Sequence, residues 1–215
     1  MSELTDAIKA GDAERVAALA AGDATLLGAL ENDVTPLLLA IYYGRRDIAA
    51  LLVERGAPVS FGEACALGDT ARVKEMLGTD PSLLRSRSAD GFPVLGLAIF
   101  FGHGALARWL IEQGADVSAA ATNAMRVAPV HAAVAMGDRE TMRVLLERGA
   151  DPNARQQVDY TPLHDAAGRG DIEMAKLLLA HGAQRDAMAA DGMTPAALAR
   201  KHEKPEFVEW FEGVE

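Results

Sequence analysis

The sequence predicts an all-α fold, a linear stack of paired helices, from two glycine series and a high apolar content. A glycine closes a short apolar segment six times, mostly 33 to 35 residues apart, at Gly11, Gly44, Gly68, Gly102, Gly137 and Gly170. A Gly-Ala pair closes a longer amphipathic segment at Gly56, Gly114, Gly149 and Gly182. Two series in fixed phase indicate two helices per repeated unit. Because 50% of the 215 residues are apolar, such a stack can bury a core without disulfides or metals.

Each unit begins with a helix-start signal. At Thr161-Pro162 the hydroxyl can cap free backbone N–H groups, and proline at the first helical position gives up an N–H that has no partner there. A glycine then ends the short helix, and an aspartate caps the next one, as at Gly170-Asp171. The following segment, 172–180, carries its apolar residues on one stripe, as a helix packed on a neighbour does. The unit is therefore a helix pair.

Several units depart from this pattern. Nine residues are missing between Gly44 and Gly68, so the unit that starts near Phe61 should enter its first helix directly after Ser60. Segment 80–84 predicts an extra turn, and segment 22–32 predicts a longer link. The helix starts at 93–94 and 128–129 lack the threonine hydroxyl and should be weaker by about 1 kcal/mol.

The two ends read as capping units of one domain that spans 1–215. Residues 1–31 form the N-terminal cap, repeats follow at 32–60, 61–88, 89–121, 122–155 and 156–187, and residues 188–215 form the C-terminal cap. The closing helix should turn an apolar face inward, made of Phe207, Val208, Trp210 and Phe211. Since both ends look capped, the sequence predicts a monomer.

The motif Thr161-Pro162-Leu163-His164 and the segment 145–153, which contains Gly149-Ala150-Asp151, resemble the ankyrin repeat. Copies of these motifs in phase extend the resemblance over essentially the whole chain. It implies an α-solenoid with short finger loops between units and a non-enzymatic protein–protein interaction module. The partner would be another protein, bound in a concave groove; an adaptor, a chaperone-like holder and an inhibitor all remain open. The alternative is an acidic surface that mimics nucleic acid or neutralises a basic protein.

In ankyrin proteins the groove is formed by the fingers and the ends of the short helices, and this expectation selects the candidate partner-binding residues. They are Tyr42, Tyr43, Leu67, Phe92, Phe100, Phe101, Arg126, Met136, Tyr160 and Arg169. Six of the eleven aromatic residues fall in this set, and aromatic, methionine and arginine side chains often anchor interfaces. Two interpretations stay open: interface anchors, or large residues that pack on one another along the groove.

The sequence predicts no catalytic residue, no cofactor and no metal site. His131 and His164 hold equivalent places in successive units, so they should lie roughly 10 Å apart, too far to share a zinc ion. The resemblance implies that they bind loop backbone. Asp165 lies beside His164 but has no nucleophile elbow near it. Cys65 is expected to be a buried core residue, and Gly102-His103-Gly104 lacks the lysine of a phosphate-binding loop.

Charge and targeting signals complete the prediction. A net charge of -10 argues against a nucleic-acid partner, which needs clustered basic residues. The N-terminus has no secretory signal, and the most apolar stretch, 94–101, is too short to span a bilayer, so no membrane partner is expected. A single cysteine fits a reducing, cytoplasmic compartment. Arginine outnumbers lysine 16 to 5, which suggests a GC-rich bacterial genome.

Overall fold

The computed structural model describes residues 2–32 and 34–213, and it confirms the all-α class. This described part of the chain contains α-helices and short 3-10 helices, and no strand longer than an isolated bridge. The chain divides into two compact units: unit 1 ends at Val94, and unit 2 begins at Leu95. Each unit consists of successive helix pairs, as the two glycine series predict.

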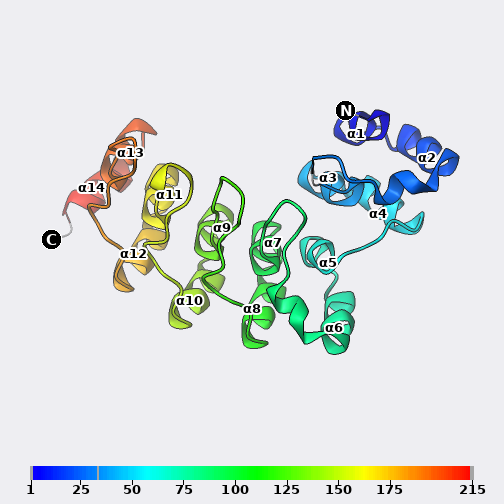
Figure 1. The fold of residues 1–215 in the computed structure, drawn as a ribbon. Helices are drawn as coiled ribbons and strands as arrows, with labels where there is room; N and C mark the ends of the chain where they lie inside the picture. The colour runs from blue at the N-terminus through cyan, green and yellow to red at the C-terminus, as the bar shows by residue number, and fades with distance from the viewer. Residues whose placement is uncertain (1, 33, 214–215) are drawn as a thin grey trace. The chain divides into compact units, whose positions relative to one another are not determined.

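Unit 1 contains three helix pairs. They are α1 (Glu3–Ala10) with α2 (Ala13–Gly22), α3 (Pro36–Tyr42) with α4 (Arg46–Glu54), and α5 (Phe61–Leu67) with α6 (Thr70–Thr79). Helix α3 packs between α1 and α5, and α2 packs on α4 (Figure 1). The 3-10 helix η2 (Pro81–Arg85) is the predicted extra turn, and η1 (Ala24–Gly28) lies in the longer link.

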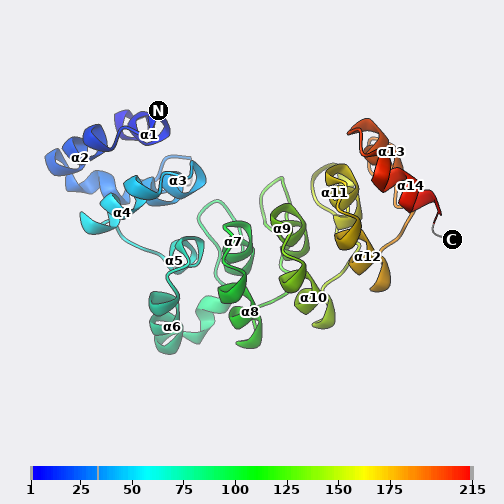
Figure 2. The ribbon, with the colours of Figure 1, turned by 180° about the vertical axis from the view of Figure 1, so that it is seen from behind.

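Unit 2 contains four helix pairs. They are α7 (Val94–Phe100, whose first residue still belongs to unit 1) with α8 (Gly104–Glu112), α9 (Pro129–Met136) with α10 (Arg139–Glu147), α11 (Pro162–Arg169) with α12 (Ile172–Ala180), and α13 (Pro195–Lys201) with α14 (Pro205–Gly213). Within this unit the first helices form one row and α8, α10 and α12 form a second (Figure 2). Fingers precede α9, α11 and α13, and the finger before α11 carries η3 (Gln157–Asp159).

The helix ends follow the sequence signals. Gly170 ends α11 with a φ of 73°, a left-handed conformation that glycine adopts without strain. Asp171 then caps α12 and accepts the Met174 N–H at 3.0 Å. Asp12, Asp69 and Asp138 cap their helices in the same way. The predicted Gly-Asp junction between paired helices is confirmed.

The threonine caps are only partly as predicted. The Thr35 hydroxyl accepts the Leu38 N–H, and the Thr194 hydroxyl accepts the Ala197 N–H. At Thr161 the prediction of a hydroxyl cap is wrong, because that hydroxyl meets the Nδ1 atom of His164 at 2.9 Å and makes no cap to the backbone. At this helix start, the imidazole ring of His164 is the hydrogen-bond partner of the threonine hydroxyl.

The unit that starts near Phe61 lacks a finger, as the missing residues predict. Helix α5 begins at Phe61 with Ser60 as its cap. The buried Glu63 accepts the Ser60 N–H at 2.7 Å and also binds the hydroxyl of Thr35 from the preceding helix pair. A carboxylate thus occupies the third helical position here, where α9 and α11 carry a histidine.

Two expectations about the core are confirmed, one of them in part. Cys65 is fully buried, and burial raises the pKa of its thiol to about 12. In α14, Phe207 and Phe211 are buried, whereas Val208 and Trp210 remain partly exposed. Only half of the predicted apolar face of α14 therefore belongs to the core.

Candidate binding groove of unit 2

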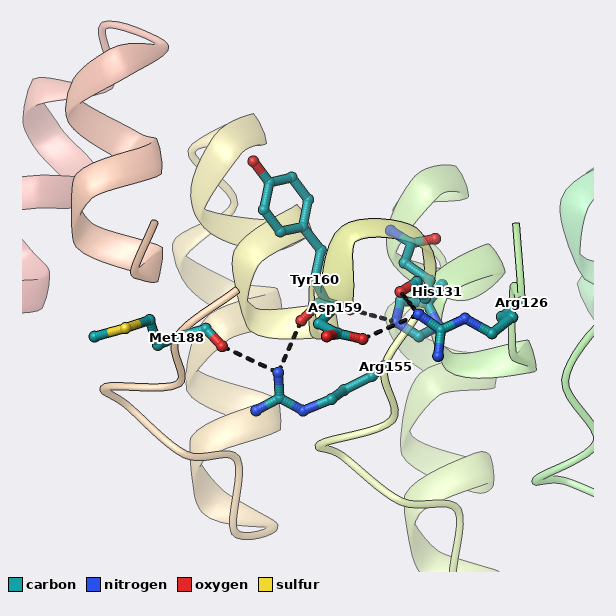
Figure 3. Close-up of polar contacts among 7 residues, drawn as sticks. Arg126, His131, Arg155, Asp159, Tyr160 and Met188 are labelled. Atoms are coloured by element: carbon teal, nitrogen blue, oxygen red, sulfur yellow. Dashed lines mark hydrogen bonds and ion pairs between the residues drawn. The ribbon is translucent and has the colours of Figure 1, made fainter. Parts of the chain in front are cut away.

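Two buried histidines join the helix starts to the fingers of unit 2. The Nδ1 atom of His164 accepts the Thr161 N–H at 3.2 Å, so Nε2 carries the proton and donates to the Met193 carbonyl at 3.0 Å. His131 makes the same pair of bonds, and Figure 3 shows its bond to the Tyr160 carbonyl. Burial lowers the pKa of His131 to about 4, so its ring is neutral at neutral pH. The structural role implied for both histidines is confirmed.

The fingers of unit 2 bind one another directly. Backbone bonds of 2.9 Å run from the Gln157 N–H to the Met125 carbonyl and from the Ala190 N–H to the Val158 carbonyl.

Arginine side chains add to these backbone bonds. Arg126 reaches the Asp159 carboxylate at 3.0 Å, and Arg155 reaches the Met188 carbonyl at 3.0 Å (Figure 3). The three fingers therefore form one connected wall, whose bonds hold the finger backbone in place.

An open groove of about 340 Å³ lies between this wall and the first helices of unit 2. We call it the unit 2 groove. Its lining consists of Phe100, Met125, Val127, His131, Ala132, Ala135, Gln156, Tyr160, His164, Asp165, Gly168, Arg169, Leu198 and His202. The lining combines apolar and aromatic side chains with a few polar ones, as binding sites typically do.

Three equivalent helix positions contribute to this lining. Counted from the proline that begins each first helix, Ala132, Asp165 and Leu198 occupy the same place. One turn later, Arg169 and His202 share another place, and Met136 is their counterpart in α9. At the first of these places, Asp165 replaces a small or apolar residue of its neighbours.

Asp165 is the most perturbed acid of the groove. Burial raises the pKa of its carboxyl to about 7, against the lowering effects of Arg169 and of a hydrogen bond from Gln156. The Gln156 side-chain amide donates to both carboxylate oxygens, at 2.9 and 3.0 Å. Among the described residues, the side-chain hydrogen bonds to this carboxylate thus come from a neutral amide and not from a cation.

Only some of the six candidate residues of unit 2 line the groove. Phe100, Tyr160 and Arg169 line the groove, and Phe100 is 49% exposed. The lining does not include Met136, which is 44% exposed, or the partly buried Phe101, whose ring meets Phe100 edge to face at 5.3 Å.

The remaining candidate of unit 2, Arg126, already binds the next finger. Its role as a partner contact stays a prediction.

The four candidate residues of unit 1 form no such set. The hydroxyl of Tyr42 donates to Asp90 at 2.5 Å, and burial, together with this bond, raises the pKa of Tyr42. Tyr43 is 49% exposed. Leu67 packs against the unit 1 core, and Phe92 is partly buried in the loop before α7.

The aromatic pairs of the two units lie in matching sequence segments. The segment 39–44 reads Leu-Ala-Ile-Tyr-Tyr-Gly, and the segment 97–102 reads Leu-Ala-Ile-Phe-Phe-Gly. The helix pair directly before each segment matches as well. In both, the second helix is followed by a 3-10 helix, which Asp23 caps in one case and Asp80 in the other. Tyr42 thus corresponds to Phe100, and Tyr43 to Phe101.

Comparison with known proteins supports the family assignment along most of the chain. A single ankyrin repeat matches residues 32–61, ankyrin repeats in three copies match 61–156, and ankyrin repeats in many copies match 145–199. The chain belongs to the ankyrin-repeat family. Ankyrin repeats are generally non-catalytic protein–protein interaction modules.

One curated relative illustrates how such repeats occur within a larger protein. The chain is 31% identical over 136 residues, 59% of its length, to the Transient receptor potential cation channel subfamily A member 1 homolog of Caenorhabditis elegans. The matched part covers 11% of that protein. The likeness therefore concerns the repeats and not the rest of the relative.

Within 2–32 and 34–213, no three His, Cys, Asp or Glu side chains are grouped to hold a metal ion. None of the helices in this same part of the chain is long and apolar enough to cross a membrane.

Sequence reasoning missed the groove role of Asp165 and Gln156. The sequence places Asp165 beside His164, which suggests a catalytic pair, and offers no nucleophile for it. The missing signal was an alignment of repeats on the helix-start prolines, which sets Asp165 beside Ala132 and Leu198. Gln156 gave no signal, because its contact with Asp165 depends on the fold of the finger.

Proposed function

We infer that this ankyrin-repeat chain binds a partner protein through the unit 2 groove. The observation that carries this proposal is the exposure of Phe100 beside a rigid wall of fingers. An exposed aromatic side chain at a preformed groove is the type of residue that dominates binding energy at interfaces. The structure supports a binding role and leaves adaptor, chaperone-like holder and inhibitor as biological uses of the same surface.

Exposed apolar side chains concentrate around this groove. Phe100 and Met125 line it, and Met136 occupies the α9 position that matches Arg169 in α11. Together they offer a rim of flexible and aromatic side chains around the polar Asp165. A partner segment that covers them removes apolar surface from water, which stabilises the complex by about 25 cal/mol per Å² before binding costs.

The test uses the chain as bait in extracts of its source organism, with a double variant, Phe100→Ala with Met136→Ala. A direct partner should bind the wild type and lose at least about 30-fold in affinity for the double variant, since a hot spot contributes about 2 kcal/mol or more. Leu30→Ala is the matched control, because Leu30 is an exposed apolar residue of unit 1. Equal binding of a partner to the wild type and the double variant would contradict the groove assignment.

Capture from the same extracts also tests the alternative function, in which the acidic surface binds a basic partner through charge alone. The net charge of -10 is the observation behind it, and about 0.5 M salt should then abolish capture. Capture through the apolar groove should persist at that salt concentration.

A further inference from the structure

Among the described residues, the Asp165 carboxylate of the unit 2 groove has a neutral hydrogen-bond donor and no ion pair. The hydrogen-bond donor to Asp165 is the neutral side-chain amide of Gln156, at 2.9 and 3.0 Å. Arg169 lies one helical turn further along α11 and exerts its field on Asp165, yet no ion pair joins the two among the described residues. A partly buried negative charge of this kind gains most from a cation that reaches it directly.

The surroundings of Asp165 also favour a cation. The ring of Tyr160 stacks on His164 with centroids 5.2 Å apart, and both side chains line the groove together with Phe100. Aromatic faces attract ammonium and guanidinium groups. Burial lowers the pKa values of both His131 and His164, so these rings add no positive charge at neutral pH.

We propose that the partner segment in this groove carries a lysine or arginine whose cationic group pairs with Asp165, next to an apolar side chain that packs on Phe100. This inference rests on the function proposed above and adds the chemistry of the partner. An acidic segment would place a carboxylate against Asp165, which costs energy despite the exposed Arg169. The net charge of -10 also attracts basic segments during encounter.

The proposal implies a pH dependence of binding. A cation binds the ionised carboxylate, and burial raises the pKa of Asp165 to about 7, so affinity should fall about tenfold between about pH 8 and pH 6. The other titratable or charged groups of the groove are Arg169 and His164 on α11, His131 on α9, His202 on α13 and Tyr160 in the finger before α11. Asp165→Asn retains all of them, so a dependence due to Asp165 disappears in that variant.

The test begins with a phage-displayed library of random linear peptides, panned on the wild-type chain. Enriched peptides should share a lysine or arginine beside an apolar residue. A synthetic peptide of the enriched sequence, without histidine, is then titrated into the wild type, Asp165→Asn and Asp186→Asn. Asp186 is exposed and lies outside the groove lining, so its variant is a matched control for the loss of one negative charge.

The expected result is a loss of at least tenfold in affinity with Asp165→Asn and no change with Asp186→Asn. Replacing the peptide's lysine by norleucine, or its arginine by citrulline, should cost the wild type the same factor and cost Asp165→Asn little. Thermal unfolding of each variant verifies that it is folded.

Three outcomes overturn the proposal: no peptide is enriched, the enriched peptides lack a basic residue, or Asp165→Asn binds them unchanged. Phe100→Ala separates this failure from that of the proposed function. If Phe100→Ala weakens binding and Asp165→Asn does not, the groove assignment stands and the cation inference is wrong.

Discussion

Units 1 and 2 each carry an aromatic pair at the end of a first helix, and the two pairs make different contacts. In unit 1 the hydroxyl of Tyr42 is bound to Asp90, a residue of the loop before α7. In unit 2 its counterpart Phe100 has no hydroxyl, is 49% exposed and lines the groove. A repeated motif thus places an aromatic side chain at the same helix position in both units, and the hydroxyl of Tyr42 makes a bond that Phe100 cannot make.

The units also differ at the third position of the first helix. Unit 1 uses the carboxylate of Glu63, which bonds to Ser60 and Thr35. Unit 2 uses His131 and His164, whose two ring nitrogens join a helix start to the next finger. The histidines thus support the finger wall that makes the unit 2 groove, whereas Glu63 binds back to the preceding helix pair.

The largest expected effect tests the histidine support. His164→Ala removes both ring bonds of a fully buried side chain, and it should lower the free energy of unfolding by about 3 kcal/mol in urea titrations. His181→Ala is the control, because His181 is exposed at the end of α12 and should change stability by less than about 0.5 kcal/mol. Similar losses in both variants would show that the finger support does not depend on His164.

Asp165→Asn should stabilise unit 2, in contrast to the loss of binding inferred for it. Burial raises the pKa of Asp165 to about 7 from an ordinary value of 3.8, so the folded state holds this proton more tightly than the unfolded state. The resulting stability is present at low pH and is lost as pH rises from about 4 to 7. An asparagine cannot ionise and avoids that loss.

Urea titrations at two pH values measure whether Asp165→Asn is more stable than the wild type, as expected. The variant should be more stable than the wild type by about 1 to 3 kcal/mol near pH 8, and within about 0.5 kcal/mol of it near pH 4. Asp186→Asn, at an exposed position, should show no such difference between the two pH values. A constant offset at both pH values would mean that Asp165 does not titrate between them.

Tyr42→Phe makes unit 1 resemble unit 2 by removing one oxygen atom. Losing the hydrogen bond to Asp90 should reduce the free energy of unfolding by about 1 kcal/mol. Tyr43→Phe is the matched control, since the 49% exposed Tyr43 should tolerate the change within about 0.5 kcal/mol. If the two variants are equally stable, the bond between Tyr42 and Asp90 contributes nothing to unit 1.

Periodicity and helix-end chemistry made the repeat pattern predictable from sequence. Glycine at Gly170 and aspartate at Asp171 act through local backbone geometry, which a sequence records directly. The missing finger before Phe61 was likewise a matter of counting residues. The cap at Thr161 was mispredicted because the ring of His164, three residues further along the chain, is the hydrogen-bond partner of the Thr161 hydroxyl in place of a backbone N–H.

The candidate site was less predictable, because it depends on contacts between repeats. Sequence position selected Tyr42 and Phe100 together, and only the fold shows that Asp90 binds the first and that the second lines the groove. Arg126 was selected as a partner contact, but its bond to Asp159 spans two fingers. The pKa of Asp165 depends on burial, which no short motif encodes.

The smallest expected effect concerns the finger before α11, where Val158 has a φ of 62°. A β-branched residue in the left-handed region is strained by roughly 1 to 2 kcal/mol. The loop before α7 and the finger before α13 avoid this strain, because their turns use Gly91 and Gly192, with φ values of 90° and 79°. Val158→Gly should therefore relieve strain in the finger before α11.

The net gain in stability should be under about 1 kcal/mol, since glycine also loses more backbone entropy on folding. Urea unfolding measures it, with Val127→Gly as the control in the neighbouring finger. Val127 is not in the left-handed region and is more buried than the 43% exposed Val158, so its variant should lose about 1 kcal/mol or more. If Val158→Gly is instead destabilised as much as Val127→Gly, contacts of the Val158 side chain outweigh its strain.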